Sequence, residues 1–265
     1  MKTILITGVT TGIGKSIVQQ LSQREDTSVI ALTKHAANDL PKNVEIHQID
    51  LTDYKQVEKL IDQIQKKHPV IDVLINNAGN GWRGMIEDTT ISEAKQQLEL
   101  NVWGLVHLTQ CVLPSMRKRK NGHIINISSV AASINYGTIG YYSATKAFIE
   151  KVSEVLALEI APWNITVSVV APGAVKTKFG HNMINIQQYD KGAYKHSYEQ
   201  WAKKFEIMFQ KPLSSDVAAA KILQLIEKPK SYAYLTKRDG FYCYLKKLLP
   251  RNLFNTVFLR RYMNL

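Results

Sequence analysis

Thr7-Gly8-Val9-Thr10-Thr11-Gly12-Ile13-Gly14 follows a short apolar segment, residues 3–7, and leads into a helical pattern that begins near residue 14. Glycines in a turn from a strand to a helix let the backbone approach a pyrophosphate, and the helix N-terminus offers it N–H groups and partial positive charge. The spacing differs from G-x-G-x-x-G, because three residues separate the first two glycines. Such a cluster can also serve tight packing alone, so the turn by itself leaves both interpretations open.

The rest of the chain alternates between short apolar segments rich in β-branched residues and longer helical patterns. Strands are predicted at residues 3–7, 28–33, 44–49, 72–76, 123–128, 165–170 and 232–235. Helices are predicted near residues 14–24, 53–67, 91–118, 141–160 and 214–227. Continuous apolar strands separated by helices are typical of a parallel sheet covered on both faces. The expected fold is therefore α/β: a single Rossmann-like doubly wound parallel sheet of about seven strands, with helices on both faces, in one domain over residues 1–265.

Charge and composition argue against several classes of protein. The net charge is +12, but residues 228–265 hold nine Lys or Arg and one Asp, so this tail alone carries +8. No helix-turn-helix, zinc-finger or RNP-type motif accompanies it, and no nucleic-acid binding is expected. No apolar run approaches the ~20 residues of a membrane span, and the N-terminus lacks a signal-peptide pattern, so we expect a cytoplasmic protein. Cys111 and Cys243 have no metal-ligand spacing, and no metal is expected.

The position that would contact the adenosine ribose lacks an acid. An acidic residue about 20 positions beyond the glycine turn is typical of sites that prefer NAD. Here Thr33, Lys34 and His35 occupy that region, and a lysine attracts a 2′-phosphate that a carboxylate would repel. The sequence thus predicts a preference for NADP(H), with NAD(H) possible. The alternative is that Lys34 is a solvated loop residue.

Tyr142 and Lys146 lie four residues apart in a helical pattern, so their side chains share one face. A nearby ammonium lowers the pKa of a phenol and makes proton exchange with a substrate oxygen feasible. Ser129 ends a predicted strand, where a hydroxyl can hold a carbonyl oxygen or simply cap a turn. Asn76-Asn77-Ala78-Gly79 ends another strand at the same edge of the sheet. Each signal alone fits a surface contact or a turn, and only their joint occurrence indicates an active site.

Together these residues resemble the short-chain dehydrogenase/reductase family, in its single-domain branch, over roughly residues 2–236. The glycine turn, Asn76-Asn77-Ala78-Gly79 and Asn101 match family motifs, and Ser129, Tyr142 and Lys146 match its catalytic residues. Asp50-Leu51 matches the acidic position at the adenine. Pro172-Gly173-Ala174-Val175-Lys176-Thr177 matches a turn near the nicotinamide.

The resemblance implies a role for each of these positions. Tyr142 would exchange a proton with the substrate oxygen, Ser129 would hold that oxygen, and Lys146 would bind the nicotinamide ribose and lower the pKa of the tyrosine. Asn101 would hold a water that links Lys146 to solvent. The residues expected at the cofactor are Gly8, Thr10, Gly12, Ile13, Gly14, Lys34, Asp50, Leu51, Asn77, Ala78, Gly79, Tyr142, Lys146, Pro172, Gly173, Val175 and Thr177. One departure weakens the NADP prediction: Thr11 stands where NADP-preferring relatives often carry a basic residue.

Two aromatic-rich segments lie outside the strand–helix alternation. Residues 178–213 are predicted to form a lid over the substrate, and the chain is similar to the branch of steroid and retinol dehydrogenases and acyl-dihydroxyacetone-phosphate reductases. A lipophilic ketone or alcohol is therefore expected, in contact with Ser129, Trp82, Tyr136, Phe179 and Met183. Residues 239–265 form a basic amphipathic tail that could touch a membrane surface, cap the pocket or form an interface.

Relatives in the family are usually homodimers or homotetramers, and we expect the same here. The main alternative function is a non-catalytic NADP(H)-binding sensor or regulatory module. Such proteins usually lose the tyrosine or the lysine, and this chain keeps both. An epimerase or dehydratase of the extended branch would need a larger C-terminal substrate domain.

Overall fold

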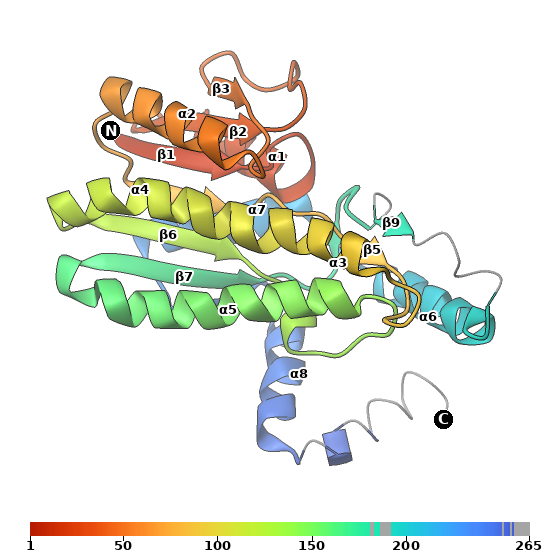
Figure 1. Cartoon of the computed structure of the whole chain (residues 1–265). Helices are drawn as coiled ribbons and strands as arrows, with labels where there is room; N and C mark the ends of the chain where they lie inside the picture. The colour runs from red at the N-terminus through yellow and green to blue at the C-terminus, as the bar shows by residue number, and fades with distance from the viewer. Residues whose placement is uncertain (181–182, 186–191, 251, 255, 257–265) are drawn as a thin grey trace.

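A seven-stranded parallel sheet forms the centre of the protein (Figure 1). The computed structural model describes residues 1–180, 183–185, 192–250, 252–254 and 256. The strands are β1 Lys2–Thr7, β2 Thr27–Thr33, β3 Glu45–Gln48, β4 Val73–Asn76, β6 Gly122–Ile127, β7 Ile165–Ala171 and β11 Tyr232–Tyr234. Their order across the sheet is β11-β7-β6-β4-β1-β2-β3, and every neighbouring pair is parallel. All seven predicted strands and the doubly wound α/β class are confirmed.

The central strand β1 shows why its sequence is apolar throughout. Ile4, Leu5 and Ile6 are fully buried. Successive side chains of a strand point to opposite faces of the sheet, so Ile4 and Ile6 enter one hydrophobic cluster and Leu5 enters the other. Both faces are therefore covered, and the strand places the glycine turn at its carboxyl end between β2 and β4.

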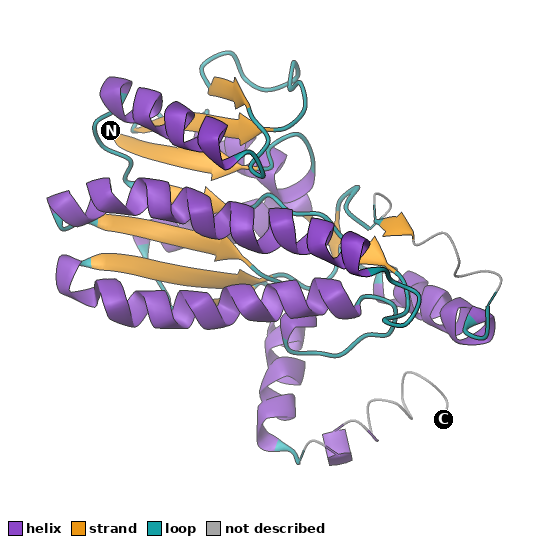
Figure 2. Ribbon diagram, in the orientation of Figure 1, coloured by secondary structure: helices purple, strands orange, loops and turns teal. Residues whose placement is uncertain are grey.

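Helices cover each face of the sheet (Figure 2). α1 Gly12–Leu21 and α7 Ser215–Glu227 pack together on one face, where Ile17, Leu21 and Ile222 share a cluster. α2 Tyr54–Lys67, α4 Leu105–Arg119 and α5 Gly140–Ile160 contribute to the cluster on the opposite face. The alternation of 10- to 21-residue helices with short strands gives this layering.

The predicted helix over residues 91–118 is not continuous. It consists of α3 Ile91–Leu98, a π-helical turn η1 Glu99–Gly104 and α4. A capping box between Thr90 and Glu93 starts α3, but the hydrophobic pattern carries no signal for the wider turn that follows. Such turns are frequent at functional sites, and this one contains Asn101.

The two segments outside the alternation contain structure of their own. In the predicted lid, α6 Lys195–Met208 follows β9 Ile184–Asn185, which pairs with β5 Trp82–Arg83; β10 Leu213–Ser214 pairs with β8 Val175–Lys176. Residues 181–182 and 186–191 of the lid lie outside the described residues, as do 251, 255 and 257–265 of the tail. No helix among the described residues is long and apolar enough to cross a membrane.

The tail begins with α8 Lys237–Leu248, which projects away from the sheet (Figure 1). Its buried Cys243 packs with Ile134 and Phe254, and the Lys246 ammonium donates to the carbonyl of Ser133. The Asp239 carboxylate lies so close to Gly173 that a Cβ on this glycine would stand 2.5 Å from it. α8 is thus fixed against the loop after Ser129 and against the Pro172–Gly173 turn.

Candidate active site

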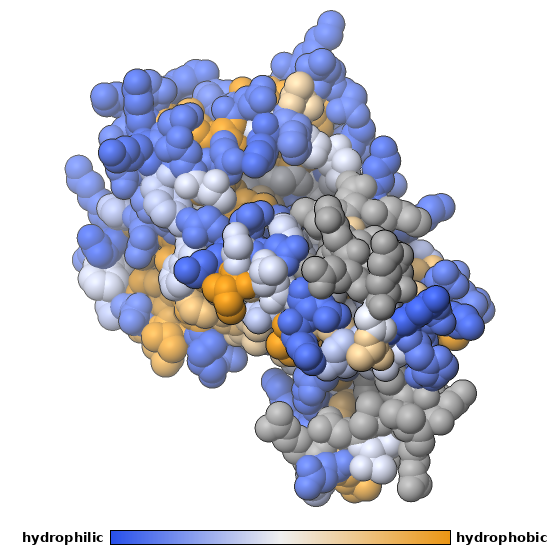
Figure 3. All heavy atoms as spheres, turned by 45° about the vertical axis from the view of Figure 1, so that its right-hand side comes forward, coloured by the Kyte–Doolittle hydropathy of each residue, from blue (hydrophilic) through white to orange (hydrophobic). Residues whose placement is uncertain are grey.

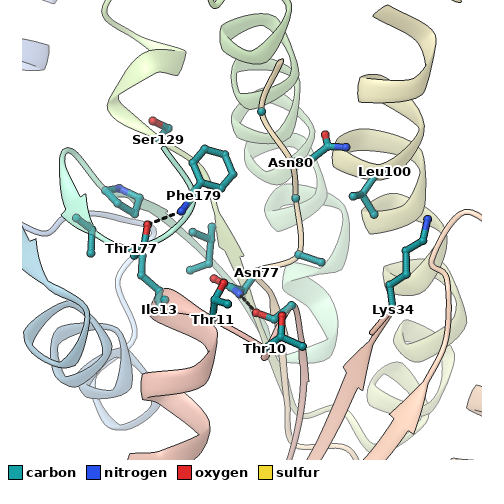
Figure 4. Close-up of a pocket in the computed structure, with 18 of the residues that line it drawn as sticks. Thr10, Thr11, Ile13, Lys34, Asn77, Asn80, Leu100, Ser129, Thr177 and Phe179 are labelled. Carbon is teal, nitrogen blue, oxygen red and sulfur yellow. Dashed lines mark hydrogen bonds between the residues drawn. The ribbon is translucent and has the colours of Figure 1, made fainter. Parts of the chain in front are cut away.

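A cavity of about 510 Å³ opens at the carboxyl ends of the strands, within the size range of ligand sites. It brings together most of the predicted site: Gly8, Thr10, Gly12, Ile13, Lys34, Asp50, Leu51, Asn77, Ala78, Gly79, Ser129, Tyr142, Lys146, Pro172, Gly173, Val175, Thr177 and Phe179 line it. Five predicted residues do not line it, namely Gly14, Asn101, Trp82, Tyr136 and Met183. In Figure 4, Lys34 lies at one side of the pocket and Ser129 with Phe179 at the other, with Thr10, Thr11 and Asn77 between them.

The glycine turn has the geometry of an anion-binding loop. Gly8 and Gly12 adopt positive φ angles of 72° and 58°, which side chains rarely allow. The side chain of Thr11, the N-cap of α1, makes no capping bond, and the first turn of the helix contains no acid. The N-terminus of α1 therefore presents its N–H groups and positive dipole end to the cavity. These residues fit the pyrophosphate of a dinucleotide.

Gly14 contributes by making room inside the turn. A Cβ at this position would stand 2.2 Å from the Gly8 carbonyl oxygen and 2.5 Å from the Asn77 amide nitrogen. The Asn77 amide donates to the carbonyls of Thr7 and Gly8 at 3.0 and 2.9 Å. The side chain of Asn77, predicted to contact the cofactor, thus braces the glycine turn.

Lys34 and Asp50 meet at the side of the cavity where the sequence predicted the adenosine. The lysine ammonium lies 2.7 Å from the Asp50 carboxylate, and 61% of the lysine side chain is exposed. Burial raises the pKa of Asp50, but the hydrogen bond from Lys34 and those from Thr52 outweigh it, and the net shift is downward. The two residues, predicted to serve ribose and adenine separately, form one polar pair.

The acid–base residues converge at the other end of the cavity. Tyr142 and Lys146 lie on α5 and are only 8% and 5% exposed. The Lys146 ammonium is 5.8 Å from the centroid of the Tyr142 ring. The hydroxyl of Ser129, which follows β6, hydrogen-bonds the Tyr142 phenol. The phenol, ammonium and hydroxyl that the sequence predicted to converge do lie together.

The pKa of the tyrosine shifts in the direction opposite to the one expected. Burial raises the pKa of Tyr142 to about 12, and the hydrogen bond from Ser129 opposes this shift. The hydrogen bond from Ser129, and not the Lys146 ammonium, is what opposes the shift. The ammonium donates to the Ile127 carbonyl at 2.8 Å, and burial lowers the pKa of the lysine itself to about 8. Tyr142 is therefore protonated at neutral pH, which is the form that donates a proton.

Asn101 supports the site from outside the cavity. Its fully buried amide donates to the Asn80 carbonyl at 2.8 Å and accepts from the Asn80 amide at 2.9 Å. It also donates to the Thr145 hydroxyl at 3.2 Å. The side chain thus joins the loop after β4 to the helix of Tyr142.

An apolar cluster lies beside the phenol. Buried Ala131, Ile139, Tyr142 and Phe205 pack with the partly buried Tyr136, Phe179 and Met183. The rings of Tyr142 and Phe179 are 5.6 Å apart between centroids. Three of the residues predicted at the substrate thus gather here, whereas Trp82 lies on β5.

The sequence analysis missed a polar network beneath the site. Glu150 follows Lys146 by one helical turn and accepts hydrogen bonds from Ser128 at 2.8 Å and Tyr232 at 2.7 Å. Burial raises the pKa of Glu150. In the sequence, this network was indicated by the four-residue spacing of Glu150 from Lys146, which places both side chains on one face of a helix.

A nucleotide-sized cavity at the switch edge of a parallel sheet, with a buried tyrosine and lysine and a half-buried serine at one end, defines a dinucleotide-dependent oxidoreductase. The family model described as short chain dehydrogenase matches residues 2–187. A 3-ketodihydrosphingosine reductase of Bacteroides thetaiotaomicron is 39% identical over 179 residues, 68% of this chain and 66% of that protein. The probable short-chain type dehydrogenase/reductase VdlC of Helicobacter pylori is 30% identical over 259 residues, 96% of this chain and 95% of that protein.

A solved short-chain dehydrogenase from Streptomyces avermitilis has a TM-score of 0.80 and 27% identity, covering 99% of this chain and 96% of that one. The chain therefore belongs to the short-chain dehydrogenase family. It is an oxidoreductase of CH–OH and C=O groups that uses a nicotinamide dinucleotide.

Proposed function

We propose that this protein is an NADP(H)-preferring reductase of a lipophilic ketone, with Tyr142 as its proton donor. The observation that carries this proposal is the buried phenol of Tyr142, hydrogen-bonded by Ser129 at the end of a cavity whose other end is the glycine turn. The phenol is protonated at neutral pH, which is the form that a reduction requires of its proton donor.

Each residue has a defined task in this scheme. The bound nicotinamide supplies the hydride. The Ser129 hydroxyl holds the substrate oxygen as negative charge develops there, and Tyr142 gives it a proton. Lys146, fixed at the Ile127 carbonyl, holds the ribose hydroxyls and returns a proton to the phenol. Asn101 positions the Asn80 loop and α5 around them.

The cofactor preference rests on charge at the adenosine side of the cavity. Lys34 and His35 line that side together with Asp50. A 2′-phosphate would compete with the Asp50 carboxylate for the Lys34 ammonium, which is exposed enough to turn toward either.

The lipophilic substrate rests on the apolar cluster around the phenol. Aromatic and aliphatic side chains in contact with a reacting group favour an apolar ligand. The similar protein of Bacteroides thetaiotaomicron is named for the reduction of 3-ketodihydrosphingosine, which supports a ketone of this character.

The acid–base assignment is tested by Tyr142→Phe, with Tyr141→Phe as the matched control because Tyr141 does not line the cavity. The Tyr142 variant should lose about 10²–10⁴ in kcat, the usual contribution of a positioned general acid, and should still bind NADPH by fluorescence titration. Full turnover in Tyr142→Phe contradicts the assignment. NADPH binding without reduction of any ketone in a lipophilic panel would favour the sensor alternative.

A homodimer or homotetramer is proposed from an apolar surface on η1 and α5. Trp103, Phe148, Val155 and Leu158 are 37–78% exposed, and separate orange patches interrupt the hydrophilic surface in Figure 3. Light scattering after gel filtration should give a multimer, and Leu158→Glu should dissociate it; a monomeric wild type contradicts the proposal.

Peripheral membrane contact is proposed for α8. Phe241, Tyr244 and Leu248 are 61–62% exposed on one side of this helix, in a tail with a charge of +8. Such a face suits an anionic membrane surface. Co-sedimentation with phosphatidylglycerol vesicles should be lost on removing residues 239–265, and equal binding without them contradicts the contact.

A further inference from the structure

Four buried polar atoms near the lid have no hydrogen-bond partner among the residues that the structure describes. They are Trp82 Nε1, Arg83 Nε, Thr138 Oγ1 and Lys204 Nζ, here called the donor cluster. They come from three segments far apart in the sequence: β5, the loop before α5, and α6. A buried polar group without a partner destabilises the folded protein, so four such groups on segments that meet call for an explanation.

Specific contacts hold the three segments together. The Gly84 amide donates to the Thr138 carbonyl at 2.7 Å. Arg83 places its guanidinium carbon 4.7 Å from the centroid of the Phe205 ring on α6. A Cβ on Gly137 would meet the Trp201 ring at 2.1 Å, and Lys204 lies 5.5 Å from that ring's centroid. The three segments that carry the donor cluster therefore meet between β5 and α6.

The donor cluster consists mainly of hydrogen-bond donors. Trp82 Nε1, Arg83 Nε and Lys204 Nζ can only donate hydrogen bonds, and Arg83 and Lys204 are cations. Among the described residues neither cation forms an ion pair, and both lie against aromatic faces. Burial lowers the pKa of Lys204, as expected for an ammonium without a carboxylate beside it.

The backbone at Thr138 is held in an uncommon conformation. This residue is 4% exposed and has a φ of 67°. A β-branched residue in the left-handed region is strained, and such strain is concentrated at ligand-binding and active sites. Its hydroxyl is one of the four unpartnered atoms, so the strained residue belongs to the donor cluster.

The donor cluster lies next to the apolar cluster that contains Tyr142. The Arg83 guanidinium lies over the ring of Phe205, and Phe205 packs in the same apolar cluster as Tyr142. Its ring is 6.1 Å from that of Tyr136 between centroids. A ligand could thus contact the apolar cluster with one part and the donor cluster with another.

We propose that the donor cluster binds an oxygen-rich anionic group, a phosphate or a carboxylate, carried by the substrate. Acceptor oxygens would satisfy all four atoms, and the negative charge would pair with Arg83 and Lys204. The proposal deepens the proposed function and rests on it, because the anion is taken to be part of the ketone. The substrate is then amphiphilic, with its apolar part against the Tyr142 cluster.

Binding is tested by isothermal titration with decyl phosphate, decanoate and decanol at saturating NADPH, so that the cofactor's phosphate positions are occupied. Decyl phosphate or decanoate should bind at least tenfold more tightly than decanol, and the tighter of the two identifies the anion. Arg83→Met and Lys204→Met should each weaken that anion at least tenfold and leave decanol unchanged. Lys203→Met, at the exposed neighbouring position on α6, should have no effect.

The proposal is wrong if decanol binds as tightly as both anions, or if Lys203→Met weakens the anion as much as Lys204→Met. The same titration in Tyr142→Phe separates the two proposals. If Tyr142→Phe binds the anion and also keeps full turnover, the proposal for the donor cluster is retained and the assignment of Tyr142 as the proton donor is rejected. With 3-oxodecanoate and its methyl ester as substrates, Lys204→Met should raise KM for the acid only and leave kcat unchanged.

Discussion

The Lys146 ammonium donates a 2.8 Å hydrogen bond to the carbonyl oxygen of Ile127, the last residue of β6. This bond ties the helix that carries the phenol to the strand that precedes Ser129. One turn further along α5, Glu150 accepts from Ser128. These two hydrogen bonds hold α5 against the end of β6 and so fix the distance between Tyr142 and Ser129.

The pH dependence of reduction should follow Lys146. Burial lowers the pKa of Lys146 to about 8, whereas the Glu150 carboxylate raises it. In the proposed mechanism the ammonium returns a proton to Tyr142, so kcat for reduction should fall as the pH rises through about 8. Glu150→Gln removes the negative charge and should move this break to lower pH. Glu154→Gln, at an exposed site one turn away, should leave it in place; identical profiles for all three proteins would contradict the role of Glu150.

Cofactor preference should change with Lys34. Lys34→Ala removes the ammonium that would meet a 2′-phosphate, and a charge-assisted hydrogen bond contributes about 1.5–3 kcal/mol. KM for NADPH should rise at least about tenfold, the equivalent of ~1.4 kcal/mol, with KM for NADH nearly unchanged. Lys42→Ala, at an exposed position outside the cavity lining, is the control. An equal rise for both cofactors would argue against 2′-phosphate recognition.

Gly14→Ala should disrupt the cofactor site without touching the cofactor. The new methyl group would stand 2.2 Å from the Gly8 carbonyl oxygen, so the turn must move. We expect a loss of about 1–3 kcal/mol in the free energy of unfolding, as for other overpacked sites, together with weaker NADPH binding. Gln19→Ala, on the exposed side of the same helix, should preserve both. Wild-type affinity in Gly14→Ala would show that the turn is looser than its contacts indicate.

Acid stability should depend on Glu45 at the edge strand β3. Burial raises the pKa of Glu45, but hydrogen bonds from Lys67, His68 and His47 lower it to about 2, against 4.5 in the unfolded chain. A lowered folded pKa stabilises the protein above pH 4.5, and this contribution is lost as the pH falls toward 2. Glu45→Gln should reduce the free energy of unfolding by about 1 kcal/mol at pH 7, after solvent screening, and by less near pH 3. Urea titrations with Glu25→Gln as a surface control test this, and a pH-independent difference contradicts it.

The sheet could be predicted because its strands are apolar on both faces. Ile4, Leu5 and Ile6 need no knowledge of their partners to be placed in a buried strand. Tyr142 and Lys146 could be paired for a similar reason, since helical spacing alone brings them onto one face. Local periodicity carried both predictions.

The features that escaped prediction depend on contacts between distant segments. Lys34 and Asp50 follow the carboxyl ends of β2 and β3, and the pairing of these two strands brings their charged groups together. The raised pKa of Tyr142 follows from its burial, which sequence spacing does not reveal. The donor cluster likewise depends on how β5 and α6 meet, and no motif marks it.

The contact of Asp239 with Gly173 connects the C-terminal helix α8 directly to the cavity. Through this contact the basic C-terminal tail is attached to Gly173, which lines the cavity. The hydrogen bond from Lys246 to Ser133 attaches it to the segment after Ser129. A partner that displaced α8 would therefore be expected to shift the Pro172–Gly173 turn, and with it one wall of the cavity.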